Sequence, residues 1–346
     1  MKTITRKTVL RSLAATCLLA LPIPAHAQAM MKAASGAPKV VRLDPALDAV
    51  IVPGTVVGRV AGGFIFTEGP MWKDGLLWFS DVRANKVRTL NRLGRVDVVL
   101  NDSGGVKNAP VTANFGSNGM VTDKDGSILL TRMGIGTIER MDDKGNLKPF
   151  LSRYEGKRLN SPNDLVFAKD GALWFTDPSF GLPKMDADPK KEIKFNGVYR
   201  YAGGKLAAMV TDMKAPNGIG LSPDQKTLYV SNSLPDAVIR AWTIGAGGAL
   251  SNPRVFYTWP KDAKGPAGGV PDGLKVDSAG NVWATGLDGV SILSPQGKLL
   301  GRIELPEVAA NLAFAEDGRT VFITASTSIY RLSSKIPGEI PMYYRK

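Results

Sequence analysis

One unit recurs six times along this chain, and the repeat constrains the fold more than any other feature. Each copy has a polar residue that opens an apolar strand, then a turn, then a second apolar strand that ends in Ser or Thr. Gaps of 50, 45, 54, 55 and 39 residues separate the six opening residues, which are Glu68, Asn118, Asn163, Asn217, Asp272 and Asn311. A repeat of this length, made of short strands, is typical of a propeller blade.

The spacing inside each copy indicates β-structure. The second strands end 12 to 14 positions after their opening residues, at Ser80, Thr131, Thr176, Ser231, Thr285 and Thr324. Asp-Gly turns such as Asp74-Gly75 join the two strands, and this pair favours a tight hairpin because it tolerates positive φ. We therefore predict an all-β fold, a six-bladed β-propeller with four-stranded antiparallel blades, which has no long unpaired edge. Residues 39–60 are expected to supply a strand that completes the last blade.

The first 27 residues read as a secretory signal peptide. Four basic residues precede a short apolar run, and Ala25-His26-Ala27 is a small-x-small cleavage site. We therefore expect a periplasmic or secreted protein, with a loose tail at 28–38 and a single propeller domain over 39–346. No later segment is long and apolar enough to cross a membrane, so no membrane anchor is predicted. The oligomeric state is left open.

Composition limits the chemistry. The only cysteine is Cys17 and the only histidine is His26, and both lie in the predicted signal peptide. The mature protein therefore has no disulfide, thiol nucleophile, Ser-His-Asp triad or histidine-ligated zinc. The formal net charge is +13, but the basic residues alternate with acidic ones, which favours a solvated surface over nucleic-acid binding. Catalysis is left to carboxylates, amides, hydroxyls, Lys, Arg, Tyr or a hard metal ion.

In a propeller the six opening residues converge at one mouth of the central channel. The long irregular segments 101–117, 178–196 and 258–270 are expected at the same mouth, where a rigid scaffold commonly carries a binding site. The opening residues are carboxylates and carboxamides, and such an all-oxygen set favours Ca²⁺, Mg²⁺ or Mn²⁺. The other interpretation is that each Asn or Asp only caps backbone donors at the start of its strand. We favour this structural role for Asn311.

Several motifs together resemble the regucalcin, gluconolactonase and luciferin-regenerating enzyme family, and the exported bacterial gluconolactonases most closely. The resemblance runs from about Gly62 to Thr324. It rests on Phe66-Thr67-Glu68-Gly69-Pro70-Met71-Trp72, Tyr154-Glu155-Gly156-Lys157-Arg158-Leu159-Asn160-Ser161-Pro162-Asn163-Asp164, Trp174-Phe175-Thr176-Asp177-Pro178, Pro216-Asn217-Gly218 and Pro271-Asp272-Gly273.

The resemblance implies a set of site residues. Glu68, Asn217 and Asp272 match the positions that hold one divalent cation in the family, and Asn163 matches a further ligand or substrate contact. The ion would be Ca²⁺, Mg²⁺, Mn²⁺ or Zn²⁺, with a hard oxygen-ligated ion favoured. In the family the aspartate ligand, here Asp272, is usually assigned as the base that activates water. Animal members have arginine where this chain has Ser161, so the resemblance defines the cation site better than the substrate.

The predicted function is a divalent-metal-dependent lactonase that opens a small, sugar-type lactone. A cation polarises the carbonyl and stabilises the oxyanion, while Asp272 accepts the proton of the attacking water. Asn118 and Asn163 are expected to donate hydrogen bonds to the substrate, as is Arg132 unless it is a solvated surface arginine. Two alternatives remain: a related metal-dependent organophosphate or ester hydrolase, and a non-catalytic exported propeller that binds protein or glycan.

Overall fold

The computed structural model describes residues 36–339 and 341–343, all of which belong to one compact unit. The predicted signal peptide and residues 28–35 of the predicted tail lie outside these ranges. Within the ranges, no helix has the length and apolar character that a membrane span requires.

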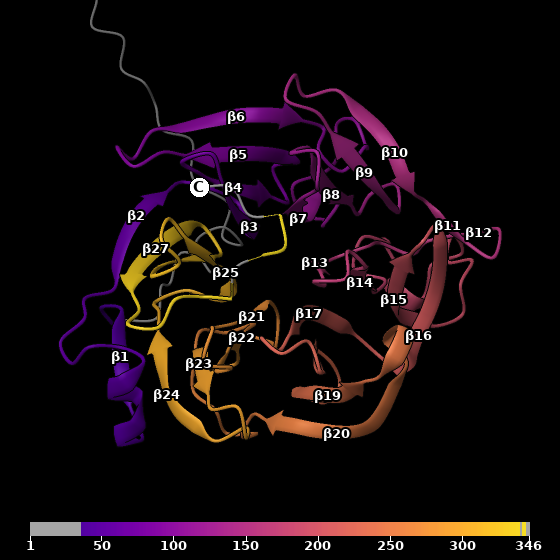
Figure 1. Cartoon of the computed structure of the whole chain (residues 1–346). Coiled ribbons are helices and arrows are strands. Elements are labelled where there is room, and N and C mark those ends of the chain that lie inside the picture. Colours follow the sequence, from indigo (N-terminus) through magenta and orange to yellow (C-terminus); the bar gives the residue numbers. More distant parts are fainter. Residues whose placement is uncertain (1–35, 340, 344–346) are drawn as a thin grey trace, which may run out of the picture. The chain divides into compact units, whose positions relative to one another are not determined.

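Among the described residues, six antiparallel sheets stand around a ring, and the innermost strand of each is the one that contains or follows an opening residue (Figure 1). The inner strands are β3 (Thr67–Lys73), β7 (Ser117–Thr122), β13 (Leu165–Phe167), β17 (Pro216–Leu221), β21 (Leu274–Val276) and β25 (Ala309–Ala315). The second strands are β4 (Leu76–Asp81), β8 (Ile128–Arg132), β14 (Leu173–Asp177), β18 (Thr227–Asn232), β22 (Val282–Gly286) and β26 (Thr320–Ala325). The third strands are β5 (Lys86–Leu90), β9 (Thr137–Met141), β15 (Asn196–Ala202), β19 (Val238–Ile244), β23 (Gly289–Leu293) and β27 (Ser328–Ser333).

The outer strands complete the blades. They are β6 (Val96–Asn101), β10 (Leu147–Leu151), β16 (Lys205–Met213), β20 (Leu250–Thr258), β24 (Leu299–Glu304) and β2 (Gly58–Gly62). Outside the blades lie the two-stranded ribbon of β11 (Arg153–Tyr154) with β12 (Lys157–Arg158) and the short 3₁₀ helices η1 (Pro45–Ala49), η2 (Met185–Ala187) and η3 (Ala246–Gly248). The predicted six-bladed propeller of four-stranded blades is confirmed.

The segment before the first blade supplies strands to two blades, whereas one strand in the last blade was predicted. Strand β2 pairs with β27 and completes the last blade, so strands from both ends of the fold share one sheet. Strand β1 (Lys39–Arg42) instead pairs with β24, as a fifth strand on the preceding blade. The ring is therefore closed by backbone hydrogen bonds between β2 and β27.

The blades are held against one another by large apolar side chains. One cluster combines Trp174 and Val198 of the third blade with Ile219 and Leu228 of the fourth, all of them buried. Burial of one such side chain stabilises the fold by about 1.5–3 kcal/mol. Because both faces of each blade are packed in this way, the inner strands sit in a rigid frame.

The turns at one end of the ring follow the local sequence. At Asp74-Gly75 both residues have positive φ, 51° and 77°, as the predicted type I′ hairpin requires. This hairpin sets the register of β3 with β4, in which Trp72 lies opposite Leu77. The opening residues lie at the opposite end of the inner strands from these turns.

Candidate functional site

A repeated hydrogen bond fixes the backbone of the opening residues. In four blades the terminal Ser or Thr of the second strand donates its hydroxyl to the carbonyl of the next blade's opening residue: Ser80 to Asn118 (2.8 Å), Thr131 to Asn163 (3.0 Å), Thr176 to Asn217 (2.7 Å) and Ser231 to Asp272 (2.6 Å). Thr285 reaches Ala310, one residue before Asn311, at 2.8 Å. We call these bonds the hydroxyl stitches. They join neighbouring blades at the mouth of the channel.

Irregular strand pairing at three of the opening residues sets the direction of their side chains. The pairing of inner and second strands shifts register directly after Glu68 and across Asn118 and Asn217, and such bulges redirect a side chain. The glycine that follows the opening residue allows two backbones to meet. A Cβ added to Gly218 would overlap the carbonyl oxygen of Asp272, so only glycine fits there.

Four of the six opening side chains lie in mutual contact. Oε2 of Glu68 accepts a hydrogen bond from its neighbour Gly69 N (2.6 Å) and another from Asn311 Nδ2 (3.1 Å). The carboxyl of Glu68 lies beside that of Asp272, and Asn217 lies beside Asp272. The structure therefore brings together Glu68, Asn217, Asp272 and Asn311.

Burial and nearby negative charge disfavour the ionised form of both carboxyls in this group. Burial, with the charge of the nearby Asp164 adding to it, raises the pKa of Glu68 to about 7. Burial and repulsion from Glu68 raise the pKa of Asp272 well above its usual range. A positive charge placed between the two carboxyls would reverse both effects.

Two amide oxygens at the mouth have no hydrogen-bond partner among the described residues. They are Oδ1 of Asn118 and Oδ1 of Asn217, and both are buried. Nδ2 of Asn217 is held by Ser233 Oγ at 3.0 Å, which leaves Oδ1 free to accept. An unpartnered buried oxygen costs free energy, and a hard cation is a partner that it suits.

The kinds of ligand available at the mouth also suit a hard cation. No group of three or more His, Cys, Asp or Glu that could hold a metal occurs in the part of the chain that the structure describes. Amide oxygens must therefore complete any set that contains Glu68 and Asp272. The residues present fit an all-oxygen cation site of two carboxylates and several carboxamides.

Comparison with known proteins places this site in a family. The family model described as "SMP-30/Gluconolactonase/LRE-like region" matches residues 66–327. The chain belongs to this family. It is 36% identical over 312 residues to the gluconolactonase of Zymomonas mobilis, with 87% of each chain covered.

Solved structures of the family give the same result. The gluconolactonase of Xanthomonas campestris is 31% identical, with a TM-score of 0.74, and the alignment covers 88% of this chain and 98% of that one. The calcium-binding protein regucalcin of Agrobacterium tumefaciens is 20% identical, with a TM-score of 0.63 and coverage of 82% and 95%, which shows a common fold. The resemblance inferred from the sequence motifs is confirmed.

The two other predicted contacts at the mouth, Asn163 and Asn118, have backbone carbonyls that accept hydrogen bonds from a neighbouring blade. The carbonyl of Asn163 accepts from Gly119 N at 2.8 Å and from the Thr131 hydroxyl, and the side chain of Asn163 is buried. Their roles toward a substrate or an ion stay predictions.

Arg132 is placed differently from the opening residues. Its guanidinium donates to the carbonyls of Ser103 (2.8 Å) and Asp102 (3.0 Å) and pairs with Glu139 (2.6 Å). These contacts fix the start of the 101–117 loop. The predicted contact with substrate stays a prediction, whereas the contacts that are present give Arg132 an anchoring role.

Sequence reasoning missed a second layer of support. The residue after the terminal Ser or Thr of the second strand accepts backbone N–H groups from the segment before the opening residue: Asp81 from Ile65 and Phe66, Asp177 from Asn160 and Ser161, and Asn232 from Ala215. Burial raises the pKa of Asp177 to about 7. The signal was present as Ser-Asp, Thr-Asp and Ser-Asn at the ends of three second strands.

Ser161, where the family motif was noted to depart from its animal members, is also structural. Its hydroxyl donates to Pro178 O at 2.6 Å and accepts from Gly181 N at 2.9 Å. The residue is fully buried. It ties the 178–196 loop to the motif that carries Asn163, and both hydrogen-bonding functions of the hydroxyl are used.

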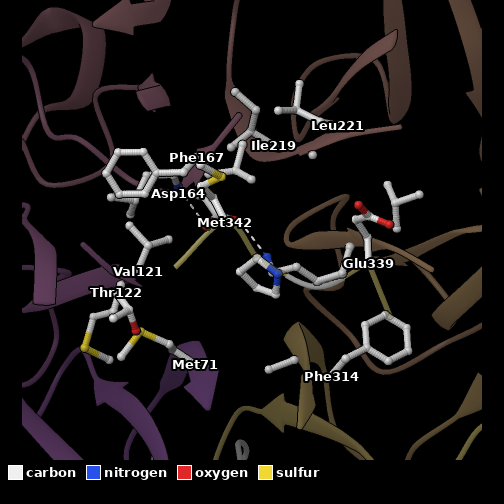
Figure 2. A pocket seen from close by; sticks show the side chains of 18 of the residues that line it. Met71, Val121, Thr122, Asp164, Phe167, Ile219, Leu221, Phe314, Glu339 and Met342 are labelled. Atoms are coloured by element: carbon white, nitrogen blue, oxygen red, sulfur yellow. Dashed lines mark hydrogen bonds and ion pairs between the residues drawn. The ribbon is translucent and has the colours of Figure 1, made fainter. Parts of the chain in front are cut away.

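A cavity of about 130 Å³ occupies the other end of the channel. It is lined by residues that follow the opening residues along the inner strands, and Figure 2 shows Met71, Val121, Ile219 and Phe314 around it. Its walls are mostly apolar. The converging carboxyl and amide groups lie at the opening-residue end, which is therefore the candidate functional site.

The C-terminal segment covers this apolar end. Glu339 N donates to Val276 O at 2.9 Å, and the Glu339 carboxylate pairs with Lys169 at 2.7 Å. The ring of Tyr343 packs edge-on against Phe167, with 5.0 Å between centroids. Figure 2 shows Met342 among the side chains that line the cavity. The channel is thus covered at one end and carries its polar group at the other.

Proposed function

We propose that this protein is a hydrolase of a sugar-type lactone that acts at the opening-residue mouth with the help of one divalent cation. Membership of the gluconolactonase family and 36% identity to the Zymomonas mobilis gluconolactonase support the reaction class. The observation that carries the chemistry is the pair of neighbouring carboxyls, Glu68 and Asp272, near the unpartnered amide oxygens of Asn118 and Asn217.

The residues that would hold the cation are Glu68, Asn163, Asn217 and Asp272. The Asn118 oxygen is a further candidate, since it too is buried without a partner. When bound, a divalent cation polarises an ester carbonyl, stabilises the oxyanion and lowers the pKa of a bound water.

The chain's own groups then have defined tasks. Histidine is absent after residue 26, so the proton of the attacking water needs a carboxylate acceptor. Asp272 suits this task because its side chain is only partly buried, whereas Glu68 is 1% exposed. Water adds to the lactone carbonyl, the ring C–O bond breaks, and the proton taken by Asp272 passes to the departing alkoxide. The product is a hydroxy acid.

Asn118 and Asn163 would orient the substrate. The amide nitrogens of both side chains make no hydrogen bond within the described residues, so each can donate to a lactone oxygen or hydroxyl. A lactone is an activated ester whose leaving group stays tethered, so a weak carboxylate base is adequate for this hydrolysis. The donors and acceptors at the mouth thus suit a small polyhydroxylated ring.

A hydrolysis panel tests the proposal. Purified protein is assayed on aldonolactones, aliphatic lactones and an organophosphate fluoride, in chelator and after addition of Ca²⁺, Mg²⁺, Mn²⁺ or Zn²⁺. We expect turnover of sugar lactones that chelator abolishes and one of the cations restores. Turnover unchanged by chelator would refute the cation, and the absence of any lactone turnover would favour a non-catalytic propeller.

Asp272→Asn tests the proton acceptor. If Asp272 accepts the proton, turnover falls by roughly 10²–10⁴ even at saturating cation. Recovery of most of the rate at high cation concentration would make Asp272 a ligand only. Asp143→Asn is the matched control, since Asp143 is an exposed aspartate in the turn between β9 and β10.

Export is part of the proposal and rests on the N-terminal sequence alone. Mass spectrometry of protein from the periplasm or medium should find a chain that begins near Gln28. A chain that keeps its first 27 residues would contradict the proposal.

A further inference from the structure

The side chain of Lys275 lies directly beneath the group of opening residues, between that group and the apolar cavity that it helps to line. Its ammonium donates to three oxygens: Leu274 O at 3.0 Å, Asn311 Oδ1 at 3.2 Å and Asp164 Oδ2 at 3.3 Å. The sequence reasoning assigned no role to this lysine.

The contacts of Asn311 determine which way round its amide lies. Oδ1 of Asn311 accepts from Leu312 N at 2.9 Å as well as from Lys275. Both partners are donors only, so a flipped amide would set its NH₂ group against an ammonium and an N–H. Nδ2 is therefore directed to the other side, where it donates to Glu68 Oε2 at 3.1 Å.

The contacts of Glu68 follow from this orientation. Oε2 already accepts from Gly69 N and from Asn311 Nδ2. The carboxylate is held by one oxygen, and Oε1 is left as the oxygen available to a cation. Lys275 and Asn311 thereby fix the rotamer of a proposed ligand without touching the ion themselves.

Charge supports the same assignment. Three carboxylates are close together here, those of Glu68, Asp272 and Asp164, and the Asp164 charge acts on both of the others. A divalent cation and the Lys275 ammonium together match these three negative charges. Lys275 pairs with the one carboxylate, Asp164, that is not an opening residue.

We propose that Lys275 and Asn311 form a positioning relay that orients Glu68 for the cation, with Lys275 also neutralising Asp164. The proposal deepens the proposed function and rests on its cation site. Neither residue is catalytic, since neither reaches the mouth-side oxygens that the substrate and ion would use. The relay makes a definite claim: Lys275 acts on cation binding through Asn311.

A double-mutant cycle tests that claim. Ca²⁺ alone is titrated calorimetrically into the full protein and into its Lys275→Met, Asn311→Leu and doubly substituted variants. Asn311→Leu should weaken Ca²⁺ binding by about tenfold, the low end of the effect of losing a residue that supports a metal ligand. Lys275→Met removes the relay but also removes a repelling positive charge, so its single effect on the dissociation constant is a balance of the two.

The cycle separates these contributions because, once Asn311 is Leu, only the charge effect remains. Lys275→Met should therefore favour Ca²⁺ binding about fivefold more in the Asn311→Leu background than in the wild type. Independent effects that multiply to within about twofold would overturn the relay. Lys275→Arg should preserve the coupling, and Lys205→Met is the control for loss of an exposed lysine. Should Lys275→Met fail to fold, Lys275→Gln carries the same cycle.

The outcomes separate the relay from the function on which it rests. Wild-type protein that hydrolyses glucono-lactone but binds no Ca²⁺ would overturn the Ca²⁺ site and the relay together. Ca²⁺ binding with independent substitutions would overturn the relay alone. Coupled substitutions in a protein without lactone turnover would support the relay and overturn only the proposed reaction.

Discussion

The hydroxyl stitch of Thr176 offers a direct test of how the mouth is held together. Its hydroxyl is fully buried, donates to Asn217 O at 2.7 Å and accepts from Asp164 N at 3.2 Å. Thr176→Val keeps the shape of the side chain and removes the hydroxyl, so two buried backbone groups lose this partner.

The expected cost follows from these two groups. Leaving a buried polar group unsatisfied costs about 1–3 kcal/mol, so for two such groups the free energy of unfolding should fall by about 2–6 kcal/mol. The same change frees the backbone of Asn217, and kcat/KM for the lactone should fall by about 10- to 100-fold. A loss of this size is a large share of the ~5–15 kcal/mol that stabilises a typical domain.

The assay is chemical denaturation, followed by tryptophan fluorescence, with kcat/KM measured on the same samples. Thr176→Ser retains the hydroxyl and should lose only about 1 kcal/mol for the missing methyl. Thr258→Val on the outer strand β20 is the matched control, because Thr258 is exposed. If Thr176→Val proves as stable as Thr258→Val to within about 0.5 kcal/mol, the stitch does not hold the mouth and the reasoning is refuted.

Three further predictions follow from other contacts. Because burial raises the pKa values of Glu68 and Asp177 to about 7, the folded protein in chelator keeps protons that the unfolded chain releases above about pH 4. Its free energy of unfolding should therefore fall as pH rises from about 4 to about 7, and a constant or rising value in denaturation series would contradict these shifts. Gly218→Ala forces an overlap with backbone and should cost about 1–3 kcal/mol, whereas Gly58→Ala, with open space around it, should be near neutral in the same assay. Arg132→Met should lower stability by about 1–3 kcal/mol if the residue anchors its loop, while a higher KM at unchanged stability would restore it as a substrate contact.

The blades could be predicted because their determinants are local. A hairpin such as Asp74-Gly75 fixes its own turn and the register of two strands, and the same spacing repeats in every blade. The edge strand β1 shows where local information ends. A short apolar segment has the same sequence pattern whichever sheet edge it pairs with. That β1 pairs with β24 depends on the path of the chain in the folded protein, which the local sequence does not show.

The candidate site likewise contains residues that the sequence could identify and contacts that it could not. The opening residues were visible because they recur, whereas their partners are distant in sequence. Asn311 does cap its neighbour Leu312, as its expected structural role implied, but its amide also contacts Glu68 across 243 positions of the chain. Lys275 lies three positions after the opening residue of the fifth copy, where the other copies have no lysine, but the sequence does not show which oxygens it contacts. Such contacts exist only once the ring is closed.

The covered end of the channel has a consequence for how substrate would enter and product would leave. Because the C-terminal segment covers one end of the channel, the substrate and the product of the proposed reaction would both have to pass through the opening-residue end. A product that has not yet left blocks the next substrate, so accumulated hydroxy acid should act as a competitive inhibitor. The same asymmetry has a practical use: protein attached to a support through its C-terminal segment would be held at the end of the channel opposite the opening residues.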